Sequence, residues 1–250
     1  MDTKIDFKNP EFYENRELSW IKFDNRVLSE ARDKSIPLLE RLKFVSITSS
    51  NLDEFFMVRV ASLLDMVHAN YKKRDIAGMT ATEQLAAINK ETRELVDTQY
   101  STYTRSLVPL LNKEGIYLVD EHETLTDEQA AFVDRYFMES VYPVLTPMAV
   151  DASRPFPLIR NKTLNIAALL SSKQNSKETV FATVQVPGVL PRLVPIPSEE
   201  GTTTFILLEQ IIERNIGLLF SNYKVLCAYP YRIMRNADLT IDEDEASDLL

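Results

Sequence analysis

The segment Asn51-Leu52-Asp53-Glu54-Phe55-Phe56 combines an amide, two carboxylates and two aromatic rings. The amide of Asn51 can donate and accept hydrogen bonds at the same time, which suits contact with a ligand. Asp53 and Glu54 are residue types that can act as acid and base. Neighbouring helix positions point in different directions, however, and acids are common in the first turn of a helix because they favour its dipole. We therefore predict scaffolding for the acidic pair and no catalytic residue.

Two interpretations of Asn51 are open on the residues alone. In the first, a helix begins here and Asn51 is its N-cap, with Glu54 three positions later completing a capping box. In the second, the carboxamide faces a ligand at the helix N-terminus, where the dipole also favours phosphate. The residue pattern favours the cap, and it predicts that Phe55 anchors the helix in the core.

The other reactive residue types form no recognised catalytic or metal-binding pattern. His68 and His122 belong to no H-E-x-x-H or similar motif, and we expect both to be solvated. Cys227 is the only cysteine and lies in an apolar run, which favours a buried structural thiol. The five glycines form neither G-x-x-x-x-G-K-[ST] nor G-x-G-x-x-G. We expect no self-contained NTPase and no metal site within this chain.

Composition and charge narrow the class of protein. The 250 residues are 45% hydrophobic and 26% charged, which is typical of a globular protein. This length allows one large core or two modest ones, and we expect two domains. There is no apolar run of about 18 residues and no signal-peptide pattern at the N-terminus. We expect a cytoplasmic protein without a transmembrane segment, and peripheral association with the inner face of the membrane stays open.

The net charge of −9 is unevenly distributed. Residues 1–78 carry 13 Lys and Arg against 13 Asp and Glu, whereas residues 79–250 carry 15 against 24. The first part is therefore the less repulsive host for a polyanion. No basic stripe with interleaved aromatic residues is present, so nucleic-acid binding is not predicted.

The elements that position Asn51 are predicted to be helices. Apolar residues at helical spacing place a first helix around Trp20 to Ala31, with Trp20 and Phe23 in the core, and a second helix that begins at Pro37. A third helix would start after Asn51. Thr80 has capping-box spacing to Glu83 and would open a long helix that runs to about residue 112. Residues 1–113 therefore read as an all-helical domain.

Residues 114–250 show a different pattern. Thr126 caps a further helix, and four prolines between Pro143 and Pro157 predict an extended connector. Strands are predicted over Thr163–Leu170, Thr179–Val186, Arg192–Ile196 and Tyr223–Met234. The first two would be joined by the loop 171–178. Another helix would begin at Thr204. We predict an α+β fold in which the helical domain precedes a mixed α+β domain with a largely antiparallel sheet.

The last residues resemble the start of another helix. Thr240 and Glu243 have capping-box spacing, and acidic residues crowd the first turn. The sequence ends at Leu250 before any C-cap signal, so we expect a piece of a longer polypeptide.

The chain closely resembles the N-terminal and head domains of the bacterial polyphosphate kinase that uses a phosphohistidine intermediate. Four N-terminal blocks at matching separations carry the resemblance: Asn15-Arg16-Glu17-Leu18-Ser19-Trp20, Asn25-Arg26-Val27-Leu28, Pro37-Leu38-Leu39-Glu40-Arg41-Leu42-Lys43-Phe44 and Ser50-Asn51-Leu52-Asp53-Glu54-Phe55-Phe56-Met57-Val58-Arg59. The head-domain blocks are Leu145-Thr146-Pro147-Met148-Ala149-Val150-Asp151, Arg154-Pro155-Phe156-Pro157 and Asn161-Lys162-Thr163-Leu164-Asn165.

The resemblance implies a parent enzyme that reversibly transfers the terminal phosphoryl group of ATP to inorganic polyphosphate, with Mg as cofactor. Family members continue into two phospholipase-D-like domains that supply the phosphorylated histidine, the magnesium-binding arginines and most nucleotide contacts. Only Asn51 carries over as an ATP-binding position, on one wall of the nucleotide site. The head domain is similar to the one through which family members form homodimers.

We therefore expect this chain to be an inactive N-terminal fragment of a polyphosphate kinase. An alternative from another class is a self-sufficient, non-catalytic binding or dimerisation module in which Asn51 only caps a helix. A third class, an independent hydrolase, is disfavoured because two isolated histidines do not assemble a nucleophile, a base and an orienting group.

Overall fold

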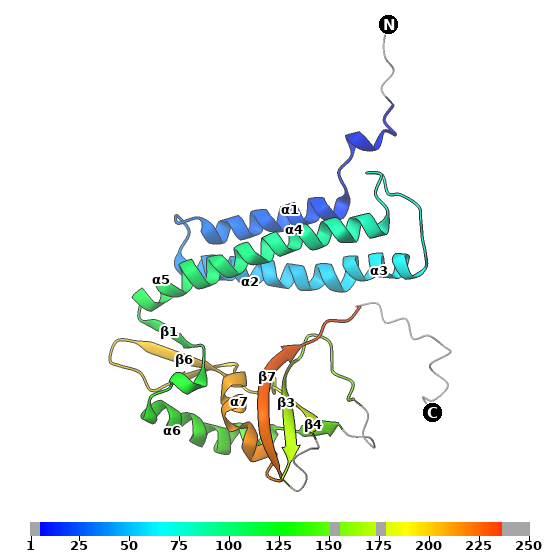
Figure 1. The fold of residues 1–250 in the computed structure, drawn as a ribbon. Coiled ribbons are helices and arrows are strands. Elements are labelled where there is room, and N and C mark those ends of the chain that lie inside the picture. The colour runs from blue at the N-terminus through cyan, green and yellow to red at the C-terminus, as the bar shows by residue number, and fades with distance from the viewer. Residues whose placement is uncertain (1–5, 151–155, 174–178, 237–250) are drawn as a thin grey trace. The chain divides into compact units, whose positions relative to one another are not determined.

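The computed structural model describes residues 6–150, 156–173 and 179–236, which fold into two compact units (Figure 1). The first unit is helical and contains the described residues up to Leu110 together with 234–236. The second unit spans Leu111–Ile233 and contains all of the strands in the described ranges. The predicted α+β fold class is thereby confirmed.

The helical unit consists of antiparallel helices that pack along their lengths (Figure 1). The chain forms α1 (Arg16–Arg32), α2 (Leu38–Phe55), a π-helical turn (Phe56–Val60) and α3 (Ala61–His68), and it returns as α4 (Ala81–Thr102), a second π-helical turn (Tyr103–Leu107) and α5 (Val108–Lys113). A short 3-10 turn (Pro10–Phe12) precedes α1. The core of the helical unit contains these buried side chains: Ile21, Leu28, Ala31, Leu52, Phe55, Val60, Leu63, Ala81, Ile88 and Leu95.

Local sequence signals explain where these helices begin and end. Thr80 accepts a hydrogen bond from the backbone N–H of Glu83, and the Glu83 side chain bonds back to Thr80, so the predicted capping box is confirmed. Helix α5, which begins in this unit, ends at Lys113, and Gly115 follows with a φ of 74°, a conformation that favours glycine. Helix α2 begins one residue later than predicted, because Pro37 takes the N-cap position.

Two predictions about the helical unit are wrong. Phe23 is 47% exposed, so it is not a core residue, and Ile21 and Leu28 fill the core from α1 instead. No new helix starts after Asn51, because α2 continues through this residue to Phe55 and then passes without a break into the π-helical turn and α3. The sequence from 38 to 68 contains neither proline nor glycine, so no helix-breaking residue interrupts the continuous helical segment.

The second unit contains two sheets. Strand β6 (Thr203–Leu207) lies between β1 (Ile116–Val119), which is parallel to it, and β5 (Leu193–Ile196), which is antiparallel. The larger sheet is fully antiparallel, with the order β2 (Pro147–Val150), β4 (Thr179–Gln185), β3 (Leu164–Ser172) and β7 (Tyr223–Arg232). The largely antiparallel sheet was predicted, whereas the parallel β1–β6 pair was not.

Helices α6 (Asp127–Tyr136) and α7 (Leu208–Leu219) complete the core of this unit. Thr126 caps α6 with Gln129 in a capping box, as predicted. Short turns flank α6 and lead into β2: His122–Thr124, a π-helical turn at Phe137–Val141, and Tyr142–Val144. Every second residue of β3, namely Ile166, Ala168 and Leu170, is buried against this core.

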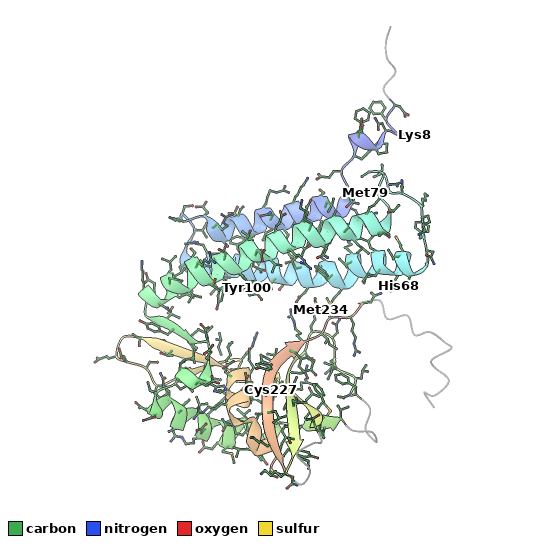
Figure 2. All side chains as sticks on the ribbon, in the orientation of Figure 1. Lys8, His68, Met79, Tyr100, Cys227 and Met234 are labelled. Carbon is green, nitrogen blue, oxygen red and sulfur yellow. The ribbon has the colours of Figure 1, made fainter. Side chains whose placement is uncertain are left out.

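Two predictions about the second unit are also wrong. The helix expected from Thr204 begins at Leu208, because the β-branched and aromatic residues of Thr203–Leu207 extend as strand β6. Cys227, which Figure 2 labels on the edge strand β7, is exposed rather than buried, because it lies opposite Leu169 of β3, which is itself 37% exposed. The apolar sequence around Cys227 therefore indicates strand propensity rather than burial.

Two sequence predictions lie wholly or partly outside the described residues: the helix start at Thr240–Glu245 and the loop between β3 and β4. Within the described ranges, no helix combines the length and the apolar character that crossing a membrane would need.

Candidate functional site

Asn51 lies inside α2, so it is not an N-cap, and both interpretations that placed it at a helix N-terminus are wrong in that respect. Asn15 does cap an α-helix of this unit: its side-chain oxygen accepts hydrogen bonds from the backbone N–H groups of Glu17 and Leu18 at the start of α1. The local pattern of Asn51, two acids and a hydrophobic run resembles a helix start. The helix nevertheless continues through Asn51, because the packing of the whole of α2 stabilises the continuous helix more than a local N-cap would stabilise a new one.

The Asn51 side chain instead binds α1. Its Nδ2 donates a hydrogen bond to Oδ1 of Asp24, at 2.8 Å. Asp24 is fully buried, and its second oxygen, Oδ2, receives no hydrogen bond within the part of the chain that the structure describes. Burial raises the pKa of Asp24 to about 6, while the hydrogen bond from Asn51 acts in the opposite direction. Asp24 is thus a buried acid held by one partner.

Aromatic stacking one helical turn away fixes the same pair of helices. The Trp20 ring stacks on Phe55 with centroids 4.4 Å apart and an angle of 9° between planes. Trp20 precedes Asp24 by four residues on α1, and Phe55 follows Asn51 by four residues on α2. Because the helices are antiparallel and positions four apart share a face, the polar pair and the aromatic pair lie on adjacent turns. The predicted anchoring role of Phe55 is confirmed, since it is 2% exposed.

This arrangement determines which atoms of Asn51 a ligand could reach. A carboxylate only accepts hydrogen bonds, so the ionised Asp24 selects the Nδ2 side of the amide. The Asn51 oxygen and the second N–H are left for another partner, and the residue is half-buried. The site therefore offers one oriented amide, able to accept and donate, at the surface of α2.

The neighbouring acids and the two histidines form no catalytic group. Asp53 is buried, whereas Glu54 is exposed, so the two carboxylates do not share a site. His68 is exposed at the end of α3, as predicted. His122, in the other unit, is more buried than expected: its side chain is 17% exposed and its Nδ1 lies 3.4 Å from Oε2 of Glu123.

The family that the sequence resembles implies magnesium. Within the described ranges, no three His, Cys, Asp or Glu side chains gather as a set of metal ligands. Asp24 is enclosed and is paired with an amide, so it does not resemble a metal ligand either. We assign no chemical step to a metal at these residues.

Sequence reasoning missed Asp24. Its signal was present, because an acidic residue four positions after Trp20 occupies the helix face that the apolar residues bury. It missed a second polar cluster in the same unit as well. Asn15, 4% exposed, donates to Asp75 at 2.7 Å and to Gln84 at 2.9 Å, and so ties α1 to α4 and to the loop before it.

Comparison with known proteins assigns the family. The model of the polyphosphate kinase N-terminal domain matches residues 13–119, and that of the polyphosphate kinase middle domain matches residues 128–250. Polyphosphate kinases of Lactiplantibacillus plantarum and Halalkalibacterium halodurans are 51% and 49% identical over 98% of this chain. The crystal structure of polyphosphate kinase from Porphyromonas gingivalis superposes with a TM-score of 0.79 over 92% of the chain, at 31% identity.

The chain belongs to the polyphosphate kinase family and contains its N-terminal and middle domains. It spans about a third of the length of these relatives, with 34% of the Lactiplantibacillus protein and 34% of the Porphyromonas chain covered.

The buried acid generates a prediction about pH. Since the pKa of Asp24 in the folded protein, about 6, lies above its ordinary value of 3.8, the folded state holds this proton more tightly than the unfolded state. The stabilisation from this group is complete below the ordinary pKa and is lost as pH rises through about 6, by roughly 3 kcal/mol in the free energy of unfolding. We expect Asp24→Asn to remove that loss, so that the variant exceeds the parent in stability at pH 7.

Urea unfolding followed by the fluorescence of Trp20, the only tryptophan, measures this in the helical unit. Asp65→Asn, an exposed change on α3, is the matched control and should keep the parental pH dependence. An unchanged pH dependence in Asp24→Asn would contradict the assignment of a raised pKa to Asp24.

Proposed function

We propose that the protein containing this sequence reversibly transfers the terminal phosphoryl group of ATP to inorganic polyphosphate, and that the α1–α2 face forms one wall of the ATP site with Asn51 as the contact. Family membership supports the reaction, because the similar proteins are polyphosphate kinases. The oriented amide of Asn51 supports the contact: Asp24 holds Nδ2 and leaves the oxygen directed elsewhere.

In this proposal the helical domain, residues 1–113, binds nucleotide, and the α+β domain, residues 114–250, mediates self-association. The partners are ATP and polyphosphate, with Mg accompanying the nucleotide, and the location is the cytoplasm. Phosphoryl transfer requires cationic groups that neutralise the equatorial oxygens and a nucleophile held in line. The described residues assemble no such constellation around Asn51, so this chain contributes binding rather than chemistry.

We expect the purified chain of residues 1–250 to make no polyphosphate from ATP and Mg. An assay with radiolabelled ATP in the terminal position checks this, with a whole polyphosphate kinase as the positive control. ATP-dependent synthesis by the 250-residue chain would contradict the proposal.

A test of the role of Asn51 must avoid leaving the buried carboxylate of Asp24 without a hydrogen-bond partner. Asn51→Ala alone leaves the Asp24 carboxylate without its partner, which costs roughly 1–3 kcal/mol and confuses binding with folding. The comparison should therefore be made in a whole polyphosphate kinase that already carries Asp24→Leu, which has the shape of aspartate but no hydrogen-bonding group, so that Asn51→Ala leaves no buried polar group unpaired. There we expect Asn51→Ala to raise the KM for ATP several-fold at an unchanged melting temperature.

A lower melting temperature with an unchanged KM would support the alternative, a non-catalytic module in which Asn51 only joins two helices. Asn89→Ala, an exposed asparagine on α4 of the same unit, is the matched control for the substitution itself.

The self-association proposal rests on the edge of the larger sheet. Strand β7 is ten residues long and lies at the end of the strand order, and Leu226 and Tyr229 on it are 48% and 66% exposed. An open edge strand with exposed apolar side chains is a surface on which another chain can pair. The occupant that we propose is the same strand of a second copy.

We expect the purified chain to be dimeric at high micromolar concentration in sedimentation equilibrium, and Tyr229→Lys to weaken the dimer several-fold. Tyr100→Lys is the matched control, since Tyr100 is also 66% exposed but lies on α4. A strictly monomeric parent chain would count against dimerisation through this unit.

A further inference from the structure

A cationic pocket of about 530 Å³ lies in the helical unit, where the end of α1, the beginning of α2 and the end of α4 meet. Cations outnumber acids in its lining by four to one. The lining consists of Arg32, Lys34, Arg41, Arg105, Asp97, Thr98, Ser101, Thr102 and Ser106. Hydroxyl groups thus supply the remaining polar surface, and the pocket combines positive charge with neutral donors.

Arg41 is the built-in part of this pocket. It is only 5% exposed, its Nε donates to the carbonyl oxygen of Ala31 at 2.8 Å, and its Nη2 donates to Oγ of Ser106 at 3.3 Å. These bonds satisfy a carbonyl at the end of α1 and hold the guanidinium in place. The guanidinium has five N–H groups, and the other three have no acceptor among the described residues.

No carboxylate of the described residues forms an ion pair with Arg41. The nearby Asp33 is exposed, and its Oδ1 accepts the backbone N–H of Ser35 at 2.8 Å instead. Asp97 is the one acid in the lining, and it is exposed. Hydrogen bonds with Ser35 lower the pKa of Asp33, and the positive charge of Arg41 adds to this effect, so the exposed Asp33 balances part of that charge. The role of Arg41 as a tie between helices therefore explains two of its donors, while no carboxylate of the described residues is bound to its guanidinium.

The other cations surround Arg41 from different elements. Arg32 ends α1, Lys34 lies in the loop before α2, and Arg105 belongs to the π-helical turn after α4. All three are exposed, so their side chains can turn toward a ligand without unfolding the unit. π-Helical turns occur often at functional sites, because the extra residue redirects side chains, and here the turn supplies both Arg105 and Ser106.

We propose that this pocket binds a short phosphate chain, with Arg41 as the fixed anchor and Arg32, Lys34 and Arg105 as the closing cations. Guanidinium groups bind phosphate oxygens through parallel N–H bonds, and lysine adds a point charge. The volume falls within the range of roughly 300–1,000 Å³ found for small-molecule sites, which leaves room for more than one phosphate group. The chemistry fits either an inorganic oligophosphate or the phosphate tail of a nucleotide.

The pocket is separate from the proposed ATP contact. Arg41 precedes Asn51 by ten residues on α2, which corresponds to about 15 Å along the helix axis. The two sites can therefore fail independently: loss of the Asn51 contact would leave this pocket intact, and loss of the pocket cations would leave the Asp24–Asn51 pair intact.

Isothermal titration calorimetry of the 250-residue chain with tripolyphosphate, at low salt and without phosphate buffer, tests the proposal. We expect binding that weakens as salt is added, and we expect Lys34→Gln with Arg105→Gln to reduce the affinity roughly tenfold or more. Arg59→Gln with Lys90→Gln removes the same charge from exposed positions elsewhere in the unit and should leave the affinity within about twofold.

Two results would overturn the proposal: no heat of binding with millimolar tripolyphosphate, or equal losses in the two double variants. A parallel titration with ATP separates the two sources of phosphate. Competition by ATP at similar concentration assigns the site to any phosphate chain, nucleotides included, whereas absence of competition assigns it to inorganic oligophosphate.

Discussion

The antiparallel contact between α1 and α2 is the interaction on which the helical unit depends. Two residue pairs on adjacent turns form this contact: an aromatic pair, in which Trp20 stacks on Phe55, and a polar pair, in which Asn51 donates a hydrogen bond to the buried Asp24. The stack excludes water and sets the register of the helices, while the polar pair is specific, since a carboxylate with no other partner in the described structure requires a donor at this position. Asn51, the proposed ligand contact, is thus first a structural residue.

This double role connects stability with the proposed binding function. Because Asp24 takes the Nδ2 side of the amide, Asn51 presents its oxygen in a defined direction before any ligand arrives, and a preorganised group binds at a lower entropic cost. The same reasoning applies to Arg41, which two hydrogen bonds hold in place while its other N–H groups have no acceptor among the described residues. Both residues lie on α2, so this helix would serve two binding sites at different points along its length.

Much of the fold follows from local sequence. The capping boxes at Thr80 and Thr126 and the strands β3 and β4 were predicted because each depends on residues close together in the chain. The errors arose where tertiary packing overrides local preference. Asn51 has the residue pattern of a helix cap, yet it continues a longer helix, and the apolar surroundings of Cys227 belong to an exposed edge strand.

Only one of the two polar residues of the candidate site could be predicted from the sequence. Asn51 was found through the family resemblance, but its partner Asp24 is 27 positions away and is identified only by the fold. The cationic pocket was hidden for the same reason. Its lining comes from three segments, and the balanced charge of residues 1–78 conceals the local excess of cations. A net charge summed over a range of sequence does not reveal cations that the fold brings together from separate segments.

Contact between ATP and the α1–α2 face around Asn51 can be measured by photolabelling. A whole polyphosphate kinase carrying this sequence is labelled with an azido-ATP, digested with trypsin and analysed by mass spectrometry. We expect label on peptide 44–59, which trypsin releases by cleavage after Lys43 and after Arg59 and which contains Asn51. That label should disappear when unlabelled ATP is in excess. Labelling confined to peptides outside α1 and α2 would show that this face does not contact ATP.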